Sequence, residues 1–251
     1  MSFKRIMLAV FLLGAVLLPQ KVNAMHIMEG FLSVKWAIFW WVIAIPFIIY
    51  GLKSISKITE KNPNFKLLMG VVGAFAFVVS SMKIPSITGS SSHLTGVGLG
   101  TILFGPSTMV IIGAIVLLFQ ALLLAHGGIT TLGANIFSMA IAGPIVSFLV
   151  FYIIKRNFQN VKLAVFFAAF LGDLVTYVVT SLQLALAFPQ EVGGVIGAFA
   201  KFAGVFAFTQ FPLAIVEGLL TVVIYNLLVA YNKEELSILE ANRKEGFLWR
   251  Q

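Results

Sequence analysis

Long apolar runs recur along the whole chain, and they constrain its fold more than any other feature. The runs that are longer than a soluble helix needs cover residues 34–52, 67–82, 94–104, 106–126, 130–154, 161–187 and 202–230. Charged residues make up only 10% of the chain, whereas soluble proteins carry about 25%. The sequence therefore predicts an all-α, polytopic membrane protein, with about seven transmembrane helices if each run crosses a bilayer.

The run at 94–104 is too short to cross a bilayer alone, and it contains Gly96, Gly98 and Gly100. We expect either a tilted half-helix or a re-entrant piece, because irregular backbone at membrane depth survives only where protein buries it or where it lines a cavity. If this run did not cross, the basic residues at 155–162 would fall on the outer side. The usual cytoplasmic excess of Lys and Arg therefore favours counting it as a crossing.

Basic residues also predict the orientation of the chain. Seven crossings from an outer N-terminus place these residues on the cytoplasmic side: Lys53, Lys57, Lys61, Lys66, Lys155, Arg156, Lys162, Lys233, Arg243 and Lys244. Only Lys35, Lys83 and Lys201 remain outside. Because cytoplasmic loops carry the excess of positive charge, we expect a protein of the cell membrane with its mature N-terminus outside and its C-terminus in the cytoplasm.

The N-terminal segment, MSFKRIMLAVFLLGAVLLPQKVNA, has the three parts of a secretory leader. Lys4 and Arg5 precede an apolar core at 6–18, and Ala24 suits the last position before a cut. The alternative is an uncleaved first anchor, but the apolar core is short for a full span of about 20 residues. Cleavage after Ala24 is the favoured interpretation.

Three parts of the chain follow from this pattern: a signal peptide at 1–24, a transmembrane domain at 25–231 and a cytoplasmic tail at 232–251. The tail, NKEELSILEANRKEGFLWRQ, is charged and amphipathic. We interpret it as a surface helix and favour a solvated role over a docking role. We find no internal repeat that would support the inverted-repeat design of many secondary transporters.

The sequence also argues against several functions. The net charge of +8 comes mostly from residues at the ends of apolar runs, so the positive-inside bias explains it without nucleic acid. No Gly-rich phosphate loop followed by Lys and Ser or Thr occurs, and we do not expect the chain to hydrolyse ATP. The absence of Cys rules out disulfides and thiolate metal sites, and no permanent cofactor is expected.

Ionisable residues inside membrane segments are costly and mark function by default. In this chain the candidates, including those at the outer rim, are His26, Glu29, Lys83, His93, His126, Asp173 and Glu217. All three histidines of the protein are among them. Under the expected topology, His26 and His93 both lie on the outer side.

Cleavage after Ala24 would make Met25 and His26 the first two residues. The free amine of Met25, the backbone nitrogen of His26 and the nearer imidazole nitrogen of His26 can then chelate one cation in two fused rings. His93 can add a fourth nitrogen. Four nitrogens in a plane suit Ni²⁺, Cu²⁺ and, less strongly, Co²⁺, and they reject Mg²⁺ and Ca²⁺, which prefer oxygen. The alternative for His93 is a loop histidine bonded to a neighbouring Ser or Thr, such as Ser92.

The other candidates are interpreted as supporting residues. His126, in LLLAHGGITTLGAN, is either a hydrogen-bonding partner of a ligand or a capping residue in a turn, and a structural role is favoured over ligation. Asn135 can orient a ligand by a hydrogen bond, or it can make a contact between helices. The carboxylates of Glu217 and Asp173 can support the binding loop or simply tie helices together.

Four stretches together carry a specific resemblance to a known family. They are MHIMEGFL at 25–32, SSMKIPSITGSSSHLTGVGLGTILFGP at 80–106, LLLAHGGITTLGANIFSMAIAGP at 122–144 and FPLAIVEG at 211–218. They are spread over nearly the whole mature chain. The chain closely resembles the cobalt/nickel substrate-binding (S) components of energy-coupling factor transporters, the CbiM/NikM family.

The resemblance implies that Met25, His26 and His93 supply the planar nitrogens, and that the cut precedes Met25 so that its amine is free. It implies a six-helix S-component-like bundle with one extra N-terminal helix. It also implies partners: a transmembrane coupling (T) subunit, two ATP-binding cassette ATPase subunits and often a small auxiliary membrane subunit. Close helix contact with the coupling subunit is expected at Gly70, Gly73 and Ala74.

Three other functions remain to be compared with this one. A stand-alone channel or secondary carrier would need a polar path through the membrane, and the polar groups here cluster outside apart from Asp173 and Glu217. A metalloprotease-like enzyme would need paired ligands such as HExxH, which do not occur. A metal sensor would need a signalling domain, and the tail is too small for one.

The choice between cobalt and nickel is the most open point. Nitrogen ligands in a plane favour Ni²⁺ over Co²⁺ in the usual affinity order, but selectivity in cells follows metal supply and partners. The resemblance is nearer to the cobalt branch, which feeds cobalamin synthesis. We therefore expect an importer subunit for Co²⁺, with Ni²⁺ as the alternative.

Overall fold

The computed structural model describes residues 23–24, 26–85 and 90–244. The expected leader up to residue 22, the proposed ligand Met25 and the end of the expected tail from residue 245 lie outside the described residues.

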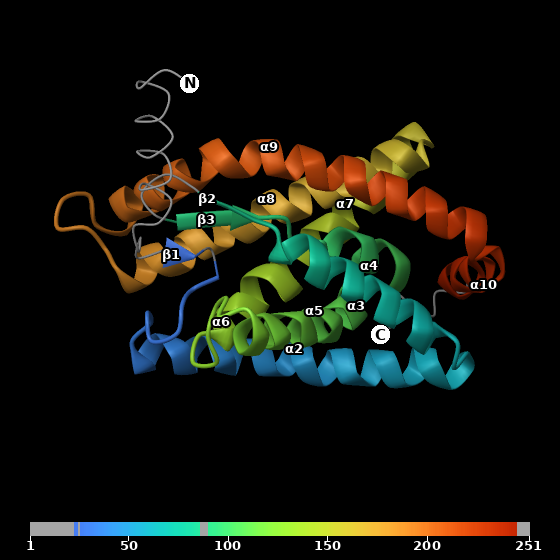
Figure 1. Cartoon of the computed structure of the whole chain (residues 1–251), viewed down its shortest axis with the longest axis horizontal. Coiled ribbons are helices and arrows are strands. Elements are labelled where there is room, and N and C mark those ends of the chain that lie inside the picture. Colours follow the sequence, from blue (N-terminus) through green and yellow to red (C-terminus); the bar gives the residue numbers. More distant parts are fainter. Residues whose placement is uncertain (1–22, 25, 86–89, 245–251) are drawn as a thin grey trace, which may run out of the picture.

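Helices make up most of the described chain (Figure 1). They are α2 (Val34–Lys61), α3 (Phe65–Ser81), α4 (Val97–Phe104), α5 (Pro106–Leu123), α6 (Leu132–Asn135), the π-helical η2 (Ile136–Ala142), α7 (Gly143–Phe158), α8 (Val161–Ala187), α9 (Gly194–Tyr231) and α10 (Lys233–Lys244). Among them, α2, α5, the continuous 132–158 segment, α8 and α9 are long and apolar enough to cross a membrane, and α3 is a shorter apolar helix. The all-α membrane class is confirmed.

Short strands also occur, which the sequence analysis does not predict. Strands β1 (Asn23–Ala24), β2 (Lys83–Pro85) and β3 (Ser90–His93) form one sheet in the order β1-β3-β2. The β1 and β3 pair is parallel, and the β2 and β3 pair is antiparallel. This sheet directs the chain from the end of α3 toward α4 and places His93 at its last position.

The third expected span is a short half-helix, one of the two forms expected for it. It is an eight-residue helix, α4, preceded by non-helical residues 94–96. A helix of that length extends about 12 Å, which is too short to cross a bilayer by itself. All eight residues of α4 are buried, and the helix contacts α3, α5, α7 and α8. The short helix α4 and the non-helical residues before it are thus covered by protein on several sides.

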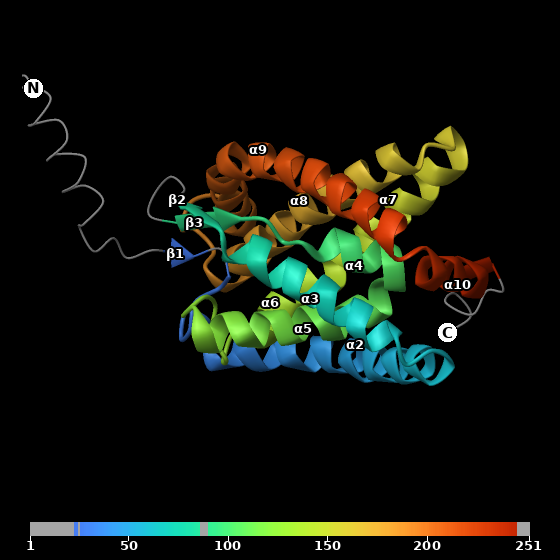
Figure 2. The same cartoon turned by 45° about the vertical axis from the view of Figure 1, so that its right-hand side comes forward.

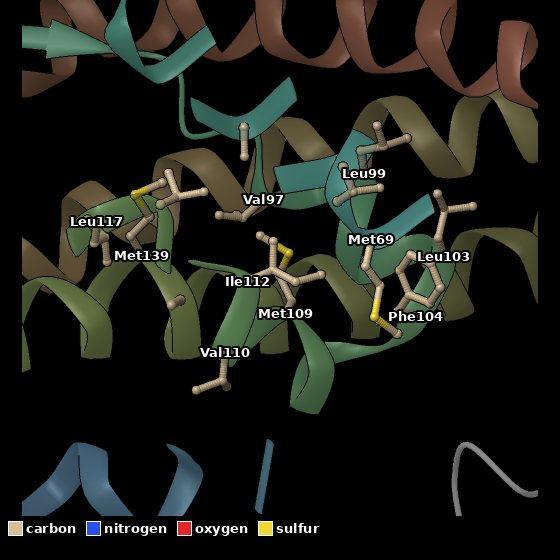
Figure 3. Packing of buried hydrophobic residues seen from close by; sticks show 14 of the residues in the cluster. Met69, Val97, Leu99, Leu103, Phe104, Met109, Val110, Ile112, Leu117 and Met139 are labelled. Atoms are coloured by element: carbon tan, nitrogen blue, oxygen red, sulfur yellow. The ribbon is translucent and has the colours of Figure 1, made fainter. Parts of the chain in front are cut away.

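Close packing around α4 depends on a small residue. An added Cβ at Gly98 would lie 2.8 Å from the Cα of Ala169 in α8, a distance at which the two helices would have to separate. Figure 3 shows Leu99, Leu103 and Phe104 of this helix grouped with Met69 of α3. These side chains belong to the largest buried apolar cluster of the described residues.

The helices run between two ends of the molecule, which Figures 1 and 2 show clearly. The three β-strands lie at one end, which we call the sheet end. The segments before α2, before α4 and after α5 also meet there, because the rings of His26, His93 and His126 contact one another. At the α10 end, a cavity of about 390 Å³ is lined by Leu103 of α4 and Leu236 of α10, among others. Residues 94–96 and α4 therefore carry the chain from one end to the other, although not as a full helix.

The outer faces of the long helices carry exposed apolar side chains. Leu67, Leu123, Phe208 and Ile196 are between 70% and 81% exposed. Large apolar side chains exposed to this degree are unfavourable in water and are typical of helix faces that contact lipid. The tail helix α10 instead buries Leu239 against the bundle, at 2% exposure, so it packs on the protein rather than standing free in solvent.

Candidate metal centre

Three imidazoles meet at the sheet end of the bundle, from segments far apart in the sequence. His26 lies just before α2, His93 ends β3, and His126 lies in the loop between α5 and α6. Their ring centroids are 4.4 to 4.7 Å apart. One ring nitrogen from each lies within 4.8 Å of those of the other two. We call these three residues the histidine cluster.

The histidine cluster is closed off from solvent. The exposed fractions are 4% for His26, 1% for His93 and 0% for His126. Burial is the main cause that lowers the pKa of each of these imidazoles, and it lowers that of His93 to about 4. All three rings are therefore neutral near pH 7, which is the form that can donate a lone pair to a metal ion.

Hydrogen bonds fix which nitrogen of His26 is free. Its Nε2 lies 2.8 Å from the side-chain oxygen of Gln120. Because an amide oxygen only accepts hydrogen bonds, Nε2 carries the proton and Nδ1 keeps its lone pair. The amide nitrogen of Gln120 in turn donates to the hydroxyl of Ser80, which donates to the carbonyl of Ala76. Gln120 is thus held in the orientation that offers its oxygen to His26.

His93 has the opposite tautomer, set by its own backbone. Its Nδ1 lies 2.7 Å from the carbonyl oxygen of Leu94 and donates to it. Nε2 therefore keeps the lone pair, and it has no hydrogen-bond partner among the described residues although it is buried. A buried imidazole nitrogen without a partner is the state expected of a ligand in a structure without metal ions.

Both sides of the His93 backbone are held by buried polar groups of α8 and α9. The hydroxyl of Tyr177 accepts from the His93 amide at 2.8 Å and donates to the His93 carbonyl at 2.6 Å. The amide of Gln210 donates to the same carbonyl at 3.2 Å and also to a carboxylate oxygen of Asp173. Ser92 is fixed as well, with its hydroxyl 2.7 Å from that of Thr209.

Glu217 binds the segment that follows His93. One of its carboxylate oxygens accepts from the hydroxyl of Thr95 at 2.8 Å and from the amide of Gly96 at 3.0 Å. The other accepts from the amide of Thr95. Glu217 is 1% exposed, and these hydrogen bonds go to Thr95 and Gly96. Its carboxylate therefore orders the turn between β3 and α4.

The segment after His26 is held by the loop that contains His126. The side chain of Asn135 accepts from the amide of Ile27 at 2.9 Å and donates to the carbonyl of Ile27 at 3.2 Å. The hydroxyl of Thr131 donates to that same carbonyl. Glu29 accepts from the amide of Thr130 at 3.2 Å. The expected partner Asn135 thus contacts the backbone beside His26 rather than an imidazole.

The side chain of His126 stands apart from the other two imidazoles in its hydrogen bonding. Neither of its ring nitrogens has a hydrogen-bond partner among the described residues. Its backbone amide donates to the carbonyl of Gln120 at 3.1 Å. Gln120, Tyr177 and Gln210 were not among the residues predicted from sequence. The signal was present, since uncharged polar residues within apolar runs often bind other helices.

Comparison with known proteins identifies the family of this chain. A family model described as the cobalt uptake substrate-specific transmembrane region matches residues 26–235. The chain belongs to this CbiM family. It is 63% identical over 218 residues to the cobalt transport protein CbiM of Acetoanaerobium sticklandii, covering 87% of this chain and 90% of that one. It is 61% identical over 229 residues to the protein of the same name from Clostridioides difficile, covering 91% of each.

A solved structure shares the fold of this CbiM-family chain. The crystal structure of a transition metal transporter superimposes with a TM-score of 0.72 and covers 90% of this chain and 100% of that one. A truncated transition metal transporter gives the same TM-score. Sequence identity to both is 24%, so this likeness shows the arrangement of helices alone.

Proposed function

We propose that this chain is the substrate-capture subunit of an ATP-driven importer of the energy-coupling factor type, and that it binds Co²⁺ on the outer side of the membrane. The observation that carries the proposal is the histidine cluster, where buried neutral imidazoles from distant segments converge with unpartnered nitrogens. Membership of the CbiM family and the names of the relatives support cobalt as the metal.

The ligand set of the proposal joins the processed N-terminus to two imidazoles. After cleavage following Ala24, the amine of Met25, the backbone nitrogen of His26 and Nδ1 of His26 form the fused chelate, and Nε2 of His93 adds the fourth nitrogen. The tautomers set by Gln120 and Leu94 leave free these two ring nitrogens.

The same proposal assigns the work of ATP hydrolysis to partners. The chain would act with a transmembrane coupling subunit, two ATP-binding cassette ATPase subunits and a small auxiliary membrane subunit, delivering Co²⁺ inward for cobalamin synthesis. Ni²⁺ is the alternative cargo. The excess of basic residues at the α10 end supports a cytoplasmic α10 and an outer histidine cluster.

Metal uptake tests this function directly. Cells that lack their own cobalt importer would express the chain alone, or together with the coupling and ATPase subunits, and accumulation of radioactive Co²⁺ would be followed with and without an energy source. We expect energy-dependent uptake only in the complete set. Equal Co²⁺ uptake by cells that express the chain alone would instead support a channel or carrier.

Gln120 provides a test of the proposed ligand tautomer. We predict that Gln120→Leu lowers the Co²⁺ affinity of the processed chain by about 10- to 100-fold, as loss of a partner that orients a ligand commonly does. Gln120→Glu keeps an acceptor for Nε2–H of His26 and should lose much less. Isothermal titration of the detergent-solubilised proteins measures both. Equal affinity in Gln120→Leu and the unmodified chain would show that this hydrogen bond does not position the ligand.

Gly73 provides a test of the proposed contact with the coupling subunit. Gly70, Gly73 and Ala74 line an apolar groove of about 460 Å³ between α3 and its neighbours. A Cβ at Gly73 would meet only Ile112, at an ordinary 3.5 Å, so a larger side chain is compatible with the fold itself. We expect Gly73→Leu to fill the groove and weaken co-purification with the partner subunits.

The matched control for Gly73→Leu is Gly204→Leu in α9. An added Cβ at Gly204 meets nothing within 4 Å, and this residue lies outside the groove. Normal co-purification of both variants, with normal yields, would place the coupling contact elsewhere on the chain.

A further inference from the structure

His126 is the most unusual buried polar group among the described residues. Its side chain is fully buried, and both of its ring nitrogens lack a hydrogen-bond partner. Burying polar atoms without partners costs free energy, which a satisfied histidine or an apolar residue at this site would avoid. A group retained at such a cost needs an interaction that the protein alone does not supply.

The backbone on either side of His126 is left-handed. Ala125 has a φ of 46° and Gly127 a φ of 80°; the first is uncommon for a residue with a Cβ. A side chain at Gly127 would meet the Cβ of His26 and the amide nitrogen of Asn135, each at 3.0 Å. The loop is therefore pressed against His26, and this packing brings the His126 ring to the other two.

The distances suit shared coordination of one ion. Two nitrogens at adjacent positions around a metal lie about 3 Å apart when each bond is about 2.1 Å long. One nitrogen from each of the three rings lies within 4.8 Å of those of the other two, so side-chain movements toward a shared ion bring all three into bonding range. The His126 ring is tilted by 42° to that of His26 and perpendicular to that of His93.

We infer that His126 is a direct ligand, added to the four nitrogens of the proposed function, and that it makes the site prefer Co²⁺ over Ni²⁺. The inference rests on that function. Four nitrogens in a plane satisfy Ni²⁺ and Cu²⁺, which accept square-planar surroundings. Such a set leaves only the positions above and below the plane, and Co²⁺ readily takes a fifth donor there. The third imidazole thus adds affinity for cobalt and little for nickel.

The test measures ligand number and metal preference separately. Processed chains carrying His126→Phe, which keeps a ring without nitrogens, and His126→Ala would be titrated with Co²⁺ and with Ni²⁺. X-ray absorption spectra of the Co²⁺ complexes would count the bound imidazoles. We expect three imidazoles in the unmodified chain and two in each variant. Co²⁺ affinity should fall about tenfold or more, with Ni²⁺ affinity nearly unchanged.

A buried polar residue outside the histidine cluster serves as the matched control. Ser147 is fully buried with an unpartnered hydroxyl in α7, and Ser147→Ala should alter neither the spectrum nor the ratio of the two affinities. An unmodified chain that binds Co²⁺ through two imidazoles, or His126 variants that lose both metals equally, would overturn the inference and leave the proposed function standing. An unmodified chain that binds neither metal would overturn both.

Discussion

Blocking the N-terminal amine of the processed chain should reduce its Co²⁺ affinity by about a hundredfold or more. Mutation of a residue that only hydrogen-bonds to a metal ligand typically lowers metal affinity by roughly 10- to 100-fold, and loss of a ligand should exceed that. A short Gly-Ser spacer placed ahead of Met25 converts its amine into an amide. The chelate then loses its first nitrogen, while His26 and His93 remain in place. Titration of the purified proteins with Co²⁺ measures the loss.

The control for the spacer carries the same residues at the C-terminus, and it should bind like the unmodified chain. A single added residue is a weaker test, because it makes His26 the third residue. An amine, two amides and an imidazole would then suffice to chelate Ni²⁺ or Cu²⁺ without His93. Unchanged Co²⁺ binding by the chain with the N-terminal spacer would exclude the amine as a ligand.

Removing the carboxylate of Glu217 should produce the largest effect among the supporting residues. Glu217→Ala leaves the amides of Thr95 and Gly96 and the hydroxyl of Thr95 without their acceptor. Each unsatisfied buried group costs about 1–3 kcal/mol. The turn after His93 should loosen, which lowers both the Tm of the solubilised protein and its Co²⁺ affinity.

Two further variants make the Glu217 prediction specific. Glu217→Gln keeps one acceptor oxygen and should fall between Glu217→Ala and the unmodified chain in both measurements. Glu191 is exposed at the sheet end, and Glu191→Ala should leave Tm and Co²⁺ affinity unaltered. If Glu217→Ala melted and bound Co²⁺ like the unmodified chain, Glu217 would have no part in ordering the loop.

The extent to which sequence predicted the fold depends on the kind of element. The run at 161–187 matches α8 because continuous apolar character has one stable outcome in a membrane, a full helix. The run at 202–230 is shorter than α9, which begins at Gly194. Two glycines and Lys201 in the first turns of this helix weaken the apolar signal of the sequence. The π-helical turns of η2 have no signature in the pattern, because they arise from packing.

The candidate site was predicted unevenly for a related reason. His26 and His93 stood out because imidazoles are rare in this chain, and the structure brings them together. The position of His126 beside them depends on the left-handed backbone at Gly127 and on its contact with His26, which no local pattern reveals. Gln120 was overlooked because its role follows from hydrogen bonds to Ser80 of α3 and to His26, which lie far from it in the sequence.

The N-terminus of the protein in its own membrane is the most direct test of the account. Intact mass, with terminal sequencing as a check, would be measured on protein purified from that membrane without added tags. We predict a chain that begins at Met25, which makes the amine, the amide of His26 and its imidazole available to one ion. A chain that begins at Met1, or beyond His26, would contradict the proposed metal centre.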